Sequence, residues 1–97
     1  MTLHIYADSA GASLLMGLEP DLLEQLAPAF QKFRAATGVR LSEYDDASLG
    51  PNHLVLLQRL LRDVTVEPVS AQAAYSALTA LIERAVSAGD TLRFLGE

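Results

Sequence analysis

The middle of the chain contains the stretch VRLSEYDDASLGP, residues 39–51. Within it, residues 39–44 alternate apolar and polar side chains, which is typical of a strand with one buried face. The alternation stops at Asp45 and Asp46, because paired aspartates favour a turn. Pro51 suits the first position of a helix, since its φ is already helical and its missing N–H is not needed there. We therefore predict a strand over residues 39–44, followed by a turn and a new helix.

Regular elements are also expected on both sides of this stretch. Residues 2–6 and 91–95 combine alternation with strand-forming residue types, and each is predicted to be a strand. The apolar run at residues 14–18 is too short to distinguish strand from helix. Helical spacing of apolar side chains, with proline, serine and glycine at the expected ends, predicts helices over residues 20–37, 51–64 and 70–88. Pro28 lies inside the first of these, where a kink or a break is expected.

The predicted order is β-α-β-α-α-β in a single domain, residues 1–97, with an α/β (α+β) fold of two layers, about three strands and three helices. The first strand–helix–strand passage is expected to be a right-handed crossover between parallel strands. The loops after both strands would then emerge at one end of the sheet and bring Asp8 close to Asp45 and Asp46. The exposed sheet edges, or the wide leucine face of residues 54–61, could also pair two copies in a homodimer.

Composition excludes several classes of function. The chain has 97 residues, 51% of them apolar, and neither cysteine nor tryptophan. Without cysteine it can be neither a disulfide scaffold nor a thiol enzyme, and it can hold no cysteine-ligated zinc. The formal charge of −5 argues against nucleic-acid binding, because that affinity comes largely from lysine and arginine on phosphates.

No signal for export or membrane insertion is evident. Residues 1–31 contain no lysine or arginine, so the basic start of a signal peptide is missing. The apolar runs are far shorter than a membrane span. Together with the missing cysteines, this predicts a cytoplasmic protein with no membrane partner.

The sequence Tyr44-Asp45-Asp46 is the most distinctive polar motif, and three interpretations remain open. The aspartates can form turn hydrogen bonds and lie in solvent. They can contribute to a partner-binding surface, in which tyrosine supplies contact area and the carboxylates complement a basic partner. They can also hold divalent metals, as paired aspartates do in polymerases, although here a helix follows where that chemistry needs a second strand.

An enzyme or a ligand-binding domain is the alternative to a binding protein. Its site would lie at the strand-end loops, with His4, Ser9, Asp45 and His53 as the available groups. The chain has no Gly-x-Ser-x-Gly motif for a nucleophile and no glycine-rich phosphate loop. Neither histidine has a partner at metal-ligand spacing. Catalysis is therefore the less favoured interpretation, and no catalytic residue, cofactor or metal is predicted.

Three segments resemble a group of small acidic bacterial proteins, some of which are similar to immunity proteins that neutralise toxins. The segments are Glu43 to Asp46, the helix start at Leu49-Gly50-Pro51, and the closing sequence GDTLRFLGE, residues 89–97. The resemblance covers mainly residues 43–61 and 81–97. It implies a non-enzymatic role in which the chain binds a protein, such as a toxin.

The resulting hypothesis is an acidic immunity or inhibitor-type module that binds the basic surface of a protein partner. The predicted partner-binding residues share a position in or next to the loops that follow the first two predicted strands. They are Asp8, Glu43, Tyr44, Asp45 and Asp46.

Overall fold

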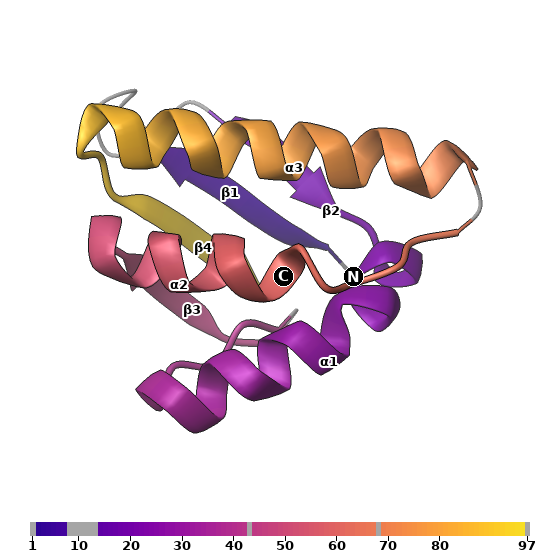
Figure 1. Cartoon of the computed structure of the whole chain (residues 1–97), viewed down its shortest axis with the longest axis horizontal. Helices are drawn as coiled ribbons and strands as arrows, with labels where there is room; N and C mark the ends of the chain where they lie inside the picture. Colours follow the sequence, from indigo (N-terminus) through magenta and orange to yellow (C-terminus); the bar gives the residue numbers. More distant parts are fainter. Residues whose placement is uncertain (1, 8–13, 43, 68, 97) are drawn as a thin grey trace.

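The structure is a computed structural model that describes residues 2–7, 14–42, 44–67 and 69–96 (Figure 1). Its elements follow the order β-β-α-β-α-α-β. They are β1 (Leu3–Ala7), β2 (Leu14–Leu18), α1 (Pro20–Thr37), β3 (Asp46–Leu49), α2 (Pro51–Leu61), α3 (Val69–Ala88) and β4 (Leu92–Gly96). The α+β class that the sequence predicts is confirmed.

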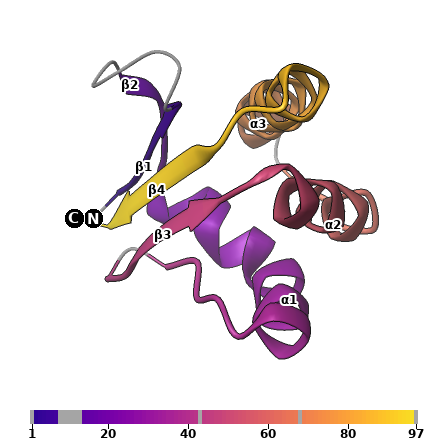
Figure 2. The ribbon, with the colours of Figure 1, turned by 90° about the vertical axis from the view of Figure 1, so that its left-hand side faces the viewer.

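The four strands form one antiparallel sheet in the order β2-β1-β4-β3. The last strand of the chain therefore lies in the middle, between β1 and β3 (Figure 2). Register fixes the two ends of the sheet: Gly96 pairs with Leu3 at one end, while Leu92 pairs with both Ala7 and Leu49 at the other. A register shift between Ile5 and Tyr6 interrupts the pairing of β1 with the edge strand β2.

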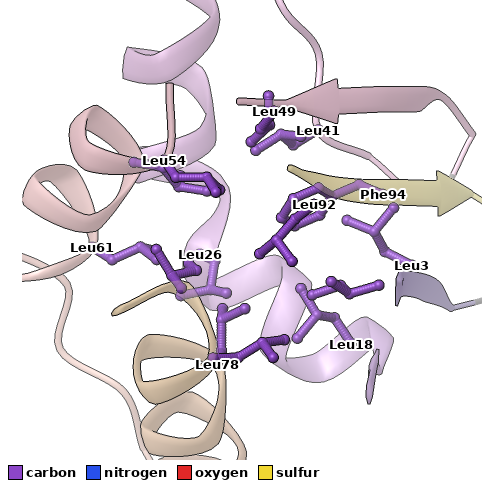
Figure 3. Packing of buried hydrophobic residues seen from close by; sticks show 14 of the residues in the cluster. Leu3, Leu18, Leu26, Leu41, Leu49, Leu54, Leu61, Leu78, Leu92 and Phe94 are labelled. Carbon is purple, nitrogen blue, oxygen red and sulfur yellow. The ribbon is translucent and has the colours of Figure 1, made fainter. Parts of the chain in front are cut away.

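All three helices cover the same face of the sheet (Figure 2). Strand residues with alternate parity, such as Ile5 and Phe94, point into this layer and are at most 1% exposed. Leucines from the helices meet them, among them Leu26 of α1, Leu54 of α2 and Leu78 of α3 (Figure 3). One hydrophobic cluster thus joins the sheet to every helix, and the remaining strand positions face away from the helices.

The predicted strand at residues 39–44 is wrong. The described part of this stretch is irregular, and the strand begins at Asp46 instead. The reason is a local turn: the hydroxyl of Ser42 accepts a hydrogen bond from the Tyr44 amide, and its carbonyl accepts one from the Asp45 amide. The alternation of Val39 and Leu41 instead reflects two apolar contacts with the core.

The predicted parallel crossover is also wrong, because every strand pairing is antiparallel. The run at residues 14–18 is a strand that folds back on β1, so the sheet has four strands where the sequence suggested about three. Helix α1 therefore connects the two edge strands, β2 and β3, across the face of the sheet.

The helices lie close to their predicted ranges. Helix α1 spans residues 20–37 as expected, and Gly38 ends it with a φ of 79°. Pro28 does not break the helix, although Figure 2 shows that its axis changes direction partway along. Helix α2 ends at Leu61, three residues earlier than expected. Within the described ranges, none of the helices combines the length and the apolar character that crossing a bilayer requires.

Candidate binding groove

The predicted acidic motif forms a tight corner between α1 and β3. The Ser42 hydroxyl donates to Oδ2 of Asp45 at 2.7 Å and accepts from the Tyr44 amide at 3.1 Å. The Asp45 amide closes the turn on the carbonyl of Ser42 at 3.3 Å. A single serine thus organises the backbone and one carboxylate of this corner.

The same corner is attached to the end of the central strand β4. The amide of Gly96 is within 3.2 Å of the Asp45 carbonyl and 3.1 Å of Oδ1 of Asp46, and donates to both. The interpretation as a turn residue is supported for Asp45, whose carboxylate accepts a hydrogen bond within the turn, whereas Asp46 begins β3 and its carboxylate accepts one from β4. Each carboxylate still keeps a second oxygen, and Asp46 is exposed.

Tyr44 is the most exposed aromatic side chain among the described residues, with 71% of its surface accessible. It lies at the tip of the turn that Ser42 organises. The Tyr44 amide donates to the Ser42 hydroxyl, so the exposed ring extends from a hydrogen-bonded residue.

A groove of about 610 Å³ opens beside this corner, between α1 and the irregular segment that leads to β3. One wall is a stripe along α1 at helical spacing: Pro20, Leu23, Glu24, Ala27, Phe30 and Arg34. The other wall is the returning chain: Arg40, Leu41, Ser42, Tyr44 and Asp45. The floor is apolar, since Phe30 and Leu41 are buried members of the core.

Charges of both signs line the groove. Two basic residues, Arg34 and Arg40, and two acidic residues, Glu24 and Asp45, are among those that line it. Glu24 and Arg34 are ten positions apart on α1, or about 15 Å along the helix axis. The wall formed by α1 therefore changes from acidic to basic along its length.

The structure brings together three of the five predicted partner-binding residues, Tyr44, Asp45 and Asp46, while Asp8 and Glu43 lie outside the described residues. Asp8 was expected near this corner because a parallel sheet would align the strand ends. The sheet is antiparallel, and Ala7 pairs with Leu92 at the end opposite to the pairing of Asp46 with Leu95. The basis for that convergence is therefore absent.

The residues considered for an enzyme are not brought together. His4 is on the face of the sheet that points away from the helices, since its neighbours Leu3 and Ile5 are buried beneath them. His53 packs edge-on against Phe33 in the helical layer, with 5.8 Å between ring centroids. Ser9 lies outside the described residues. Among the described side chains, no three of His, Cys, Asp or Glu are placed to hold a metal ion.

Neither the groove nor its two arginines could be identified from the sequence. A signal was present in α1, where Leu23, Ala27, Phe30 and Arg34 follow a helical stripe next to the fully buried one. This stripe could be interpreted as a groove wall only once the structure showed that residues 40–42, 44 and 45 line the same groove.

Comparisons with known proteins add no further constraint to this geometry. We compared the chain with models of protein families, with the curated proteins and with the solved structures, and none of the three comparisons found a match.

Proposed function

We propose that the chain is a non-enzymatic protein-binding module, an acidic immunity or inhibitor-type protein that engages a basic surface of its partner. The observation that carries the proposal is the 71% exposed ring of Tyr44, held by the Ser42 turn at the rim of a 610 Å³ groove. Tyrosine is enriched among residues that dominate binding energy, and apolar concavities beside such rings receive partner side chains.

Charge supports a basic partner. The chain has twelve acidic and seven basic residues. Asp46 is exposed next to Tyr44, and Asp45 lines the groove. Carboxylates at the rim of an interface attract a basic partner over long range, so association would be fast and would slow as salt is added.

A small-molecule site is the alternative, and the volume of the groove supports it, because ligand pockets commonly occupy about 300–1,000 Å³. The protein partner is the better match to the surface as a whole. Asp46 is exposed beside the groove, and Tyr44, which lines the rim, is 71% exposed, so a ligand contained within the groove would leave Asp46 and much of Tyr44 unused.

Three variants test this surface. The tagged protein is used to capture partners from the native host, and a captured basic protein is purified and titrated against each variant. We expect Tyr44→Ala and Asp46→Lys each to weaken binding about tenfold or more. The matched control is Glu83→Lys, which makes the same charge change at an exposed position on α3.

Two results would overturn the proposal. One is equal weakening by Asp46→Lys and Glu83→Lys, which would mean that net charge alone drives association. The other is full binding by both Tyr44→Ala and Asp46→Lys.

A further inference from the structure

Two arginines enter the groove from the same end of α1. Gly38 donates its amide to the carbonyl of Arg34 at 2.7 Å, which turns the chain back at the end of the helix. Arg40 follows two residues later, and both arginines line the groove. Two of the seven basic residues of this acidic chain therefore lie together in one concave site.

These guanidinium groups are available to a ligand. Both arginines are exposed, and no carboxylate of the described residues lies within 4.0 Å of them as an ion pair. Arginine presents a planar fork of donors that matches the two oxygens of a carboxylate. Two exposed arginines in one concave site form an anion-recognition feature that the acidic corner does not explain.

The apolar floor lies directly beside this pair. Phe30 is four positions before Arg34, so their Cβ atoms are about 5–6 Å apart on one face of α1. On the opposite wall, Leu41 is next to Arg40. In an extended chain, residues two positions apart point to the same side with a separation of about 6.6 Å. If an extended ligand chain packs an apolar side chain on Phe30, the ligand residue two positions further along α1 therefore lies near Arg34.

We propose that the groove binds an extended segment of the protein partner that carries an apolar side chain and, two residues away, a carboxylate. The apolar side chain packs on Phe30 and Leu41, and the carboxylate is held between Arg34 and Arg40. This inference rests on the proposed function, in which the partner is a protein, and it specifies a local acidic contact within a partner that is basic overall. That contact would fix the orientation of the partner on the acidic corner.

A double-mutant cycle with peptides tests the contact directly. The probes are two capped seven-residue peptides with a central tryptophan, identical except for glutamate or glutamine two positions after it. Binding is measured from amide shifts in the NMR spectra of the intact protein. We expect the double variant Arg34→Gln with Arg40→Gln to lower the affinity for the glutamate peptide about tenfold or more. Its affinity for the glutamine peptide should not change. The charge-matched control, Arg62→Gln with Arg84→Gln, removes two exposed arginines elsewhere and should change neither affinity.

Equal effects of the double variant on both peptides would overturn this inference, as would shifts that avoid the groove or the absence of any shift with either peptide. The two proposals fail separately. If the cycle shows no coupling but Asp46→Lys still weakens binding of the partner, the arginine contact is wrong and the proposed acidic surface stands. If the cycle shows strong coupling but Tyr44→Ala and Asp46→Lys leave partner binding unchanged, the groove contact stands and the proposed surface is wrong.

Discussion

At the scale of single residues, one hydroxyl joins two helices. The hydroxyl of Tyr75 on α3 donates a hydrogen bond to the carbonyl of Leu61, the last residue of α2. Carbonyls in the last turn of a helix have no partner within the helix, so a side chain from elsewhere has to satisfy them or leave them to water. Tyr75 is partly buried, so its ring packs against the core while its hydroxyl caps the end of α2.

Removing this hydroxyl should destabilise the fold. We expect Tyr75→Phe to lower the free energy of unfolding by about 1 kcal/mol, because the ring remains and a partly buried hydrogen bond is lost. Urea denaturation measures the change. Tyr6→Phe is the matched control on the sheet face opposite the helices, with an expected change below about 0.5 kcal/mol. Equal losses in both variants would argue against the capping role.

At the scale of elements, α1 contains two prolines in opposite positions. Pro20 is at the start of the helix, where no amide hydrogen is required. Pro28 is in the interior, where it cannot donate to the carbonyl of Glu24 and its ring crowds that turn. The packing of Leu26, Ala29 and Phe30 against the core holds the helix together across this site.

The same substitution should therefore have different effects at the two prolines. We expect Pro28→Ala to raise the free energy of unfolding by about 1 kcal/mol, since an alanine restores the missing hydrogen bond at an exposed position. Pro20→Ala should give no gain, because the first turn loses a residue whose φ is already helical. Thermal or urea unfolding of both variants makes the comparison, and a gain of similar size at Pro20 would contradict the explanation.

At the scale of the whole molecule, the two ends of the chain form adjacent central strands. Strand β4 is bonded on both sides, to β1 and to β3, although it contains nearly the last residues of the sequence. Strand β2 is an edge strand, and Leu14 and Leu15 are exposed on it. Among the described residues it pairs with β1 alone, and that pairing contains the register shift.

Hydrogen exchange should reflect this arrangement. We expect the paired amides of β4 to exchange only through global unfolding, and those of β2 to exchange faster through local opening at the edge. NMR-detected exchange across a series of urea concentrations separates the two routes. Equal protection of the amides in β2 and β4 would contradict the expectation that the edge strand opens locally before the central strand does.

Much of the local structure could be predicted from local signals. Pro20, Gly38 and Pro51 mark helix ends correctly, because a fixed φ or a left-handed φ acts within a few residues of its own position. The first and last strands were placed within one residue of their observed bounds. The turn predicted at Asp45-Asp46 is also close to the observed one, although Tyr44 lies in the turn rather than in a strand and Asp46 already begins β3.

The sequence by itself determined the helices, the α+β class and the acidic corner, because each depends on propensities and spacings within one segment. Only the tertiary structure decided the antiparallel order of the sheet, the place of β3 and the groove. The order depends on which distant strands pair, and the last strand lies between β1 and β3. The groove depends on side chains up to 25 positions apart, from Pro20 to Asp45, meeting across a packed interface. Such convergence is a property of long-range packing, which no local pattern in the sequence encodes.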